Sequence, residues 1–145
     1  MSDICIFCRI AKKEIPSEVL YEDEHSVAFL DIDPLFPGHT LLVPKQHSET
    51  LTDLPSVQIA PIFEAAQLLT RAVEAAMDAG GSFLGINNRV SQSVPHLHIH
   101  IVPRRRKDGL RGFFWPRRKY ETDRHASETA QAIRDKITEL RAVKP

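Results

Sequence analysis

Residues 94–102 read Val-Pro-His-Leu-His-Ile-His-Ile-Val, an alternation of histidine with apolar side chains. Successive side chains of a β-strand point to opposite faces, so this stretch predicts a strand over His96–Val102 with one buried face. His96, His98 and His100 then project from the same face, while the leucine and isoleucines between them anchor the other. Histidine is poor core material, because each ring nitrogen needs a hydrogen-bond partner. Three histidines in alternation therefore indicate a functional row.

Two chemistries use such a row of imidazoles. One is metal coordination, since neutral imidazole is the commonest nitrogen ligand. The other is nucleophilic catalysis at phosphorus, in which one imidazole attacks while its neighbours orient it and serve the leaving group. Both are compatible with this strand if different rings carry them.

The segments around the histidine strand predict an α+β fold, as one domain over residues 1–145. Short apolar runs between turn signals predict four more strands of an antiparallel sheet of about five, at Val19–Glu22, Ser26–Asp31, His39–Pro44 and Ser82–Asn87. Apolar residues at three- and four-residue steps predict a long helix over Ser56–Ala79 and a C-terminal helix over Ser127–Ala142. The apolar positions of the long helix, taken as one face, are Val57, Ile59, Ala60, Phe63, Ala66, Leu68, Leu69, Val73, Ala76 and Met77.

Composition favours an ordinary globular protein. The 145 residues are 42% hydrophobic and 26% charged, with a formal net charge of zero, so no overall field favours nucleic acid or an acidic membrane. The sequence shows neither a signal-peptide pattern nor a membrane-length apolar run, so the expected location is the cytoplasm. A local basic stretch, residues 104–119, is either a solvated strand exit or a rim that attracts phosphate-bearing ligands.

Beyond the histidine run, three blocks resemble the histidine-triad superfamily in its chain order. These are CIFCRIAKKEIPSEVLYED at residues 5–23, AFLDIDPLFPGHTLLVPKQH at 28–47 and SQSVPHLHIHIVPR at 91–104. The resemblance covers about residues 4–104, with 105–145 as a C-terminal extension containing a helix. It implies a HIT-like fold and a nucleotide hydrolase or transferase.

The resemblance also implies roles for the triad. The nucleophile falls on His98, which attacks the α-phosphorus of a nucleotide and becomes covalently nucleotidylated before water releases the nucleoside monophosphate. His100 is similar to a residue that contacts the phosphate oxygens, and His96 completes the catalytic row. Ser93 matches a serine near the leaving group, or its hydroxyl only satisfies the turn into the strand.

The remaining nucleotide contacts implied by the resemblance lie upstream. Asp31 falls at the position that binds the ribose hydroxyls, although it could be an ordinary turn residue. The other implied contacts are Phe7, Ile10, Phe29 and Ile32 for the base, and Asn87 and Gln92 near the phosphate. The four apolar residues are equally compatible with plain core. The loop at residues 87–93 departs from the family pattern, because it is about two residues shorter and lacks glycine, which puts close backbone approach to the phosphate in doubt.

Cys5 and Cys8, a close pair of thiols, suggest metal binding or redox activity in a cytoplasmic chain. With His47 and His96 they resemble the four ligands of zinc-bearing triad proteins and of the related galactose-1-phosphate uridylyltransferases. Two thiolates and two imidazoles would close a tetrahedral structural zinc site. Free thiols or a redox pair are the alternatives; a thioredoxin-like pair is disfavoured, because the motif does not open a helix that follows a strand.

The resulting hypothesis is a homodimeric enzyme that cleaves a purine nucleotide at the α-phosphate, with a nucleoside phosphoramidate favoured as the substrate. A dinucleoside polyphosphate hydrolase and a nucleotide-binding adaptor with little activity are the alternatives. A nucleic-acid binder using the basic stretch with Phe113, Phe114 and Trp115 would leave the triad unexplained. His39 either faces the site or is an ordinary edge-strand residue.

Overall fold

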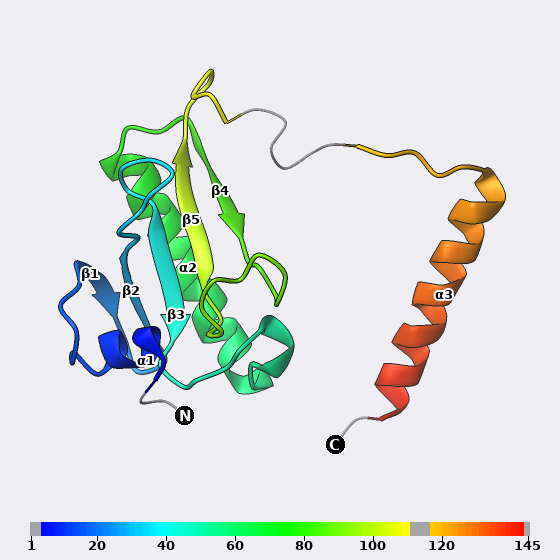
Figure 1. Cartoon of the computed structure of the whole chain (residues 1–145), viewed down its shortest axis with the longest axis horizontal. Helices are drawn as coiled ribbons and strands as arrows, with labels where there is room; N and C mark the ends of the chain where they lie inside the picture. Colours follow the sequence, from blue (N-terminus) through cyan, green and yellow to red (C-terminus); the bar gives the residue numbers. More distant parts are fainter. Residues whose placement is uncertain (1–3, 111–116, 144–145) are drawn as a thin grey trace. The chain divides into compact units, whose positions relative to one another are not determined.

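The computed structural model describes residues 4–110 and 117–143 (Figure 1). Phe113, Phe114 and Trp115 lie outside the described residues. The chain forms two compact units, one up to Asp108 and one from Gly109 onward. The first unit contains the predicted sheet, and the second contains the C-terminal helix.

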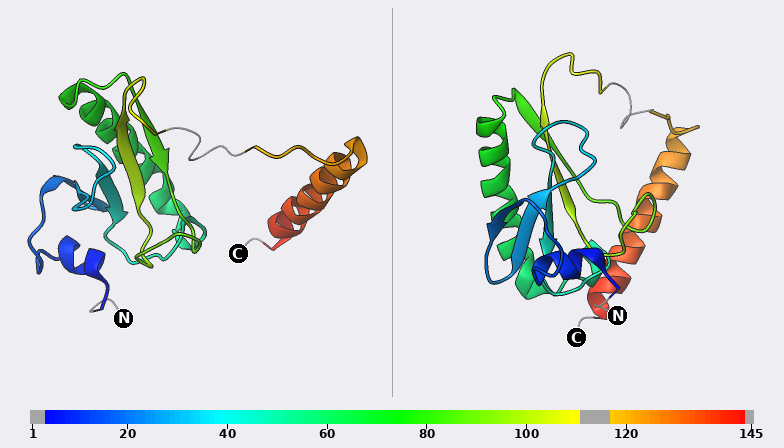
Figure 2. Two further views of the ribbon diagram at one scale, coloured as in Figure 1. Left: turned by 45° about the horizontal axis from the view of Figure 1, so that its top comes forward. Right: turned by 60° about the vertical axis from the view of Figure 1, so that its left-hand side comes forward.

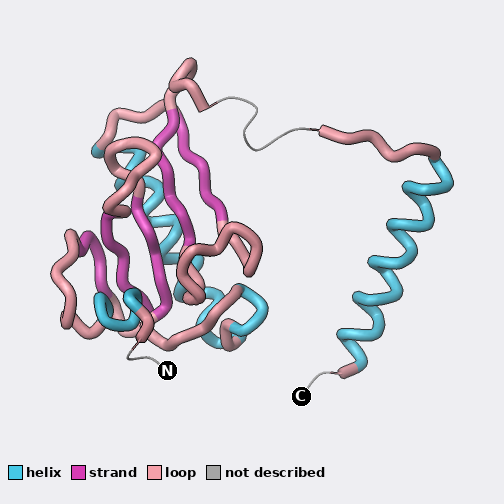
Figure 3. Tube along the Cα trace, viewed as in Figure 1, coloured by secondary structure: helices cyan, strands magenta, loops and turns pink. Residues whose placement is uncertain are grey.

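The first unit is built on a five-stranded sheet in the order β1-β2-β3-β5-β4, with every neighbouring pair antiparallel (Figure 3). Its strands are β1 (Val19–Glu22), β2 (Ser26–Leu30), β3 (Thr40–Pro44), β4 (Gly81–Gly85) and β5 (Ile99–Arg104). The predicted α+β fold with an antiparallel sheet of about five strands is confirmed.

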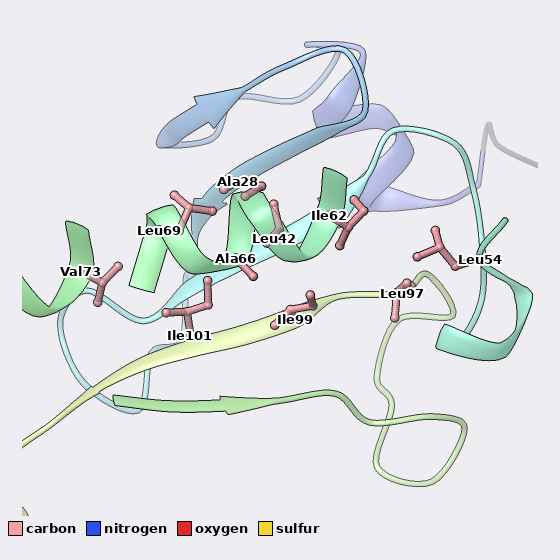
Figure 4. Packing of buried hydrophobic residues seen from close by; sticks show 11 residues of the cluster. Ala28, Leu42, Leu54, Ile62, Ala66, Leu69, Val73, Leu97, Ile99 and Ile101 are labelled. Atoms are coloured by element: carbon pink, nitrogen blue, oxygen red, sulfur yellow. The ribbon is translucent and has the colours of Figure 1, made fainter. Parts of the chain in front are cut away.

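The long helix α2 (Ser56–Ala76) covers one face of the sheet (Figure 2). Its buried residues pack against strand residues that alternate toward it, as Figure 4 shows for Leu42 of β3 and for Ile99 and Ile101 of β5. The buried helix residues are Ile62, Ala65, Ala66, Leu69 and Val73. This packing fixes which face each residue of β5 presents.

The opposite face of the sheet carries a second apolar cluster that includes the short helix α1 (Ile6–Ala11). Phe7 and Ile10 of α1 pack there with Phe29 of β2 and Leu41 of β3. Leu41 lies directly beside His100 in the sheet register. The alternation of β5 therefore places His100 on the α1 side, opposite Ile99 and Ile101 as the sequence pattern predicted.

The prediction that β5 begins at His96 is wrong, because the strand begins at Ile99. The backbone before it bonds locally: the N–H of His96 donates to Val94, the N–H of Leu97 donates to Ser48, and the His96 carbonyl accepts from a side chain. These groups are not available for a sheet ladder. The first two histidines thus lie in an irregular segment that leads into β5.

The predicted single apolar face of α2 is right only in part. Ala66, Leu69 and Val73 are buried as predicted, whereas Val57, Ile59, Phe63 and Leu68 are exposed. The helix ends at Ala76 rather than Ala79. The three- and four-residue spacing of apolar residues identified the helix, but it did not show which of these residues contact the sheet.

The turn from β2 to β3 brings His39 to the start of β3 and depends on Gly38, whose φ is 96°. A Cβ at Gly38 would lie 2.6 Å from Cγ of Met77. Both the left-handed backbone and the close approach require glycine here.

In the second unit, α3 (Asp123–Ala142) begins four residues before the predicted start. Thr122 caps it by accepting a hydrogen bond from the N–H of His125 at 3.0 Å. None of its residues is buried. Over the described ranges, no helix has the length and apolar character needed to cross a membrane.

Candidate active site

A cavity of about 440 Å³ opens on the α1 side of the sheet, beside the second and third histidines of the triad. We call it the triad cavity. It is lined by Ile6, Phe7, Ile10, Ile15, Pro16, Ser17, Phe29, Leu30, Asp31, Ile32, Asp33, Leu41, Ser93, Val94, His98 and His100. Its lining is mainly apolar with a few polar groups, which is typical of a small-molecule site.

The structure brings most of the predicted site residues to this cavity. Phe7, Ile10 and Phe29 are buried and belong to the apolar cluster as well, so the core and pocket interpretations both hold for them. Ile32 is 90% exposed and lies at the rim. The carboxylate of Asp31 also accepts a turn hydrogen bond from the N–H of Asp33 at 2.9 Å.

Asn87 and Gln92 do not line the triad cavity. Gln92 instead ties down its own loop, since its side chain accepts from the N–H of Arg89 at 2.7 Å and donates to the carbonyl of Glu49 at 2.6 Å. The loop turns without glycine by placing Arg89 and Ser91 at φ of 66° and 59°. The missing glycine is thus replaced by two strained residues.

The backbone sets the tautomer of His98. Its Nδ1 lies 2.7 Å from the carbonyl oxygen of His96, which can only accept, so Nδ1 carries a proton. The lone pair of the neutral ring is then on Nε2. The residue is only 4% exposed, and its ring packs edge-on against Phe7 at a centroid separation of 5.2 Å. These contacts fix both the orientation and the tautomer of the ring.

His100 has a different neighbour on its Nδ1. That nitrogen lies 2.9 Å from Nε2 of His39, a buried histidine whose sequence position left its role open. Nε2 of His39 also lies 3.7 Å from the Asp31 carboxylate. The structure therefore places His39 in direct contact with the site.

Burial keeps these histidines neutral. It lowers the pKa of His100 to about 4, and His98 and His39 lower it further while the Asp31 carboxylate opposes them. Burial also lowers the pKa of His39, again opposed by Asp31. Both rings are thus neutral near pH 7, with one proton and one lone pair each.

His96 lies apart from the other two histidines, in a cluster with Cys5, Cys8 and His47. Its Nδ1 is 3.3 Å from Sγ of Cys5 and 3.5 Å from Sγ of Cys8, and Nδ1 of His47 is 3.3 Å from Sγ of Cys8. All four ligand atoms lie within 4.8 Å of one another. A tetrahedral zinc ion separates its sulfur and nitrogen ligands by about 3.5 Å. The donor set and spacing fit such an ion.

The proton on His96 is also on the correct side for a metal ligand. Its Nε2 lies 2.8 Å from the carbonyl oxygen of Pro44 and therefore donates, which leaves a lone pair on Nδ1 toward the thiols. Burial lowers the pKa of His96 to about 4. Burial and then the adjacent Cys5 raise the pKa of the Cys8 thiol to about 11, so a cation must displace the thiol proton when it binds.

The helix α1 was not predicted. Cys5 is its N-terminal cap and Cys8 lies inside it, so the cysteine pair opens a helix, and no strand precedes that helix among the described residues. Six residues are too few for a clear periodic signal. The helix supplies two thiols to one cluster and Phe7 and Ile10 to the cavity.

A second hollow of about 380 Å³ adjoins the triad cavity, and Ile6, Ser93 and Val94 line both. The second hollow lies on the side of the cysteine cluster and is lined by Ile4, Cys5, Ile6, His47, Glu49, Ser93, Val94 and Pro95. Sequence analysis did not anticipate it, nor the contributions of Ile15, Leu41 and Val94 to the triad cavity. For Leu41 the signal was available, because it alternates with buried Leu42 along β3.

The family model of the HIT domain matches residues 12–107. The chain is 37% identical over 121 residues to adenosine 5'-monophosphoramidase HNT1 of Saccharomyces cerevisiae, covering 83% of this chain and 75% of that protein. It is 34% identical over 143 residues to adenylylsulfatase HINT3 of Arabidopsis thaliana, covering 94% of this chain and 71% of that protein.

Among solved structures, one similar fold is that of a zinc-bound histidine triad family protein from Mycobacterium smegmatis. The TM-score is 0.71 at 35% sequence identity, and the match covers 99% of this chain and 100% of that one.

Proposed function

The chain belongs to the HIT domain family, and from this premise we propose that it is a nucleotide hydrolase or transferase acting at the α-phosphate of a purine nucleotide through a covalent intermediate on His98. The observation that carries the proposal is the 2.7 Å contact between Nδ1 of His98 and the His96 carbonyl oxygen, which assigns the proton of the neutral ring to Nδ1. A neutral imidazole with its Nε2 lone pair beside an apolar cavity is an activated nucleophile.

In the first step, Nε2 of His98 attacks the α-phosphorus, a phosphorus–nitrogen bond forms, and the bond to the leaving group breaks. The attacking ring becomes cationic, and the Nδ1–H bond to the His96 carbonyl stabilises that charge. The leaving group departs on the side lined by Ser93 with a proton taken from solvent water, and the proton released by the attacking water in the second step returns to solvent. Water then attacks phosphorus, releases the nucleoside monophosphate and restores the neutral ring.

The remaining cavity residues support binding in this proposal. The apolar wall of Phe7, Ile10 and Phe29 suits a purine base, and Asp31 suits the ribose hydroxyls. His100 faces the same cavity and supplies an N–H to a phosphate oxygen. Asn87 and Gln92, which lie away from the cavity, act at most through the loop that carries Ser93.

We infer a nucleoside phosphoramidate as the favoured substrate, and a dinucleoside polyphosphate as the second candidate. The support for the phosphoramidate is that two relatives carry the names adenosine 5'-monophosphoramidase and adenylylsulfatase.

Cys5, Cys8, His47 and His96 are proposed to hold a structural zinc ion, supported by their spacing and by the zinc-bound relative. Zinc there would cross-link α1 to the segment before β5 and leave no open ligand position. Paired thiols that ligate zinc need a reducing compartment, which supports a cytoplasmic setting.

We further propose a homodimer. β4 is an edge strand, paired on one side only with β5 among the described strands, and α2 exposes Ile59 and Phe63 next to its buried stripe. An unpaired edge beside an exposed apolar stripe is a surface that a second copy would cover.

The test is a turnover screen with adenosine and guanosine phosphoramidates and diadenosine polyphosphates, combined with intact-mass measurement of the rapidly quenched enzyme. We expect the mass of wild type to increase by one nucleotidyl group, and the mass of His98→Ala to stay unchanged. The variant should lose at least about a hundredfold in kcat while it still binds the monophosphate. Turnover by His98→Ala near the wild-type rate would refute the nucleophile, and binding without turnover of any substrate would favour the adaptor.

A further inference from the structure

His39 has a defined hydrogen-bond partner on each ring nitrogen. The backbone N–H of Leu35 donates to Nδ1 of His39 at 3.1 Å, so that nitrogen carries a lone pair. A neutral imidazole has one proton, which must then be on Nε2. Nε2 of His39 is therefore the donor in its 2.9 Å contact with Nδ1 of His100.

The same reasoning fixes the proton of His100. Since its Nδ1 accepts from His39, the proton of the neutral ring lies on Nε2. That nitrogen is the one left to face the triad cavity, which His100 lines. His100 thus presents a donor, and His98 presents a lone pair, although the two rings are only 4.9 Å apart.

We propose that His39 is a positioning residue for the reaction: it holds His100 as the Nε2–H tautomer and so makes it a hydrogen-bond donor to the phosphate. That the acceptor is a phosphate rests on the proposed function. The direction of the two hydrogen bonds, from Leu35 to His39 and from His39 to His100, is independent of that function; we call these two bonds the relay. Negative charge develops on the phosphate oxygens in the transition state, so a donor aimed at them stabilises the transition state more than the bound substrate. Loss of this donor should therefore lower kcat.

A metal ion is the competing explanation, because Asp31, His39 and His100 bring their ligand atoms within 4.8 Å of one another. A metal on Nε2 of His39 would need a lone pair there, while the Leu35 N–H already uses the lone pair of Nδ1. The ring would have to lose both protons. The backbone hydrogen bond therefore favours a proton between the two histidines over a metal.

Asp31 adds an electrostatic link. Its carboxylate lies 3.7 Å from Nε2 of His39, too far for a strong hydrogen bond but close enough to favour a proton on that nitrogen. Asp31, which is proposed to bind the ribose, therefore also favours the protonated Nε2 with which His39 donates to His100.

The experiment compares His39→Gln, whose side-chain amide retains a donor toward His100, with His39→Glu, whose carboxylate can only accept. Two-bond proton–nitrogen correlation of the histidine rings at about pH 8.5, where neutral rings dominate, reports the tautomer. The His100 signals are assigned from their loss in His100→Asn. Wild type and His39→Gln should show the proton of His100 on Nε2, and His39→Glu should show it on Nδ1.

Kinetics provide the second measurement. We expect His39→Gln to keep kcat for an adenosine phosphoramidate within about threefold of wild type, and His39→Glu to lose at least about tenfold in kcat with a smaller change in KM. Equal kcat in two folded variants would overturn the positioning role. A wild-type His100 protonated on Nδ1 would overturn the relay itself, and this measurement needs no substrate, so it stands apart from any failure of the proposed function.

Discussion

Each buried imidazole of this protein has its proton assigned by a neighbour that cannot exchange roles. For His98 and His96 the neighbour is a backbone carbonyl, and for His39 it is a backbone N–H. The proposals above give these chemically similar side chains three different tasks: nucleophile, metal ligand and hydrogen-bond donor. The proposed nucleophile His98 differs from His96 and His100 in the position of one hydrogen, which lies on Nδ1 rather than on Nε2.

Burial of neutral histidines should make stability depend on pH, and His100 offers a clean test. Its pKa is about 4 in the folded chain, below the 6.5 of an exposed histidine. As pH falls below about 6.5 the unfolded chain binds the proton first, so the free energy of unfolding decreases until about pH 4. This ring should contribute at most about 2 kcal/mol of the loss between pH 7.5 and 5.0.

Urea unfolding of wild type and His100→Asn at the two pH values measures that contribution. The variant should lose less stability than wild type on acidification. The exposed His125→Asn serves as the control for removing one histidine. An equal drop in His100→Asn and wild type would contradict the assignment.

At the scale of elements, α1 is a short helix whose position depends on what it contacts. Six residues form too few internal hydrogen bonds to be stable alone. The apolar contacts of Phe7 and Ile10 hold it against the sheet, and the zinc proposed at the cysteine cluster would add a second attachment.

Loss of the metal should therefore affect both the stability and the cavity. Protein purified without chelator should contain close to one zinc per chain, and Cys8→Ser should contain little. The variant should melt at least about 5 °C lower, and adding chelator should lower the melting temperature of wild type but not of the variant. Wild type with no stoichiometric zinc would refute the site.

The sequence was most informative where the alternation of side chains along a strand alone decides which face a residue occupies. Alternation around His100 predicted its face correctly, because Ile99 and Ile101 must point to α2. It placed the strand start too early at His96, because local hydrogen bonds of the backbone leave no trace in a pattern of side chains. For the same reason the contact of Leu35 with His39 could not be predicted, whereas the cysteine cluster could be assembled only through family resemblance.

For the whole molecule, assembly is the first quantity to measure. Light scattering should give twice the 16.4 kDa chain mass at micromolar concentration. Phe63→Glu, on the exposed stripe of α2, should shift the protein toward the monomer. Val57→Glu makes the same change about 120° around the helix and is the control. A monomeric wild type would exclude the proposed dimer.

The second unit is proposed to influence substrate choice. The family model ends at residue 107 and the first unit ends at Asp108, so a chain truncated after Lys107 keeps the triad cavity. We expect it to fold and to change the ratio of kcat/KM for adenosine phosphoramidate over diadenosine polyphosphate, because segments leaving a strand beside a site commonly carry specificity. An unchanged ratio in the folded truncation would show that this unit has no such role.

The backbone origin of the proton assignments has a consequence for how this site tolerates mutation. A side chain that selects a tautomer can be deleted by one base change, but the carbonyls of Pro44 and His96 and the N–H of Leu35 survive any substitution at those positions except proline at residue 35. The proton positions of His39, His96 and His98 therefore follow the path of the chain, whereas that of His100 depends in addition on one side chain, His39. Most residues around the histidines can change, and with them the substrate, without moving the protons of the first three rings. The donor role proposed for His100 is kept only while position 39 carries a hydrogen-bond donor.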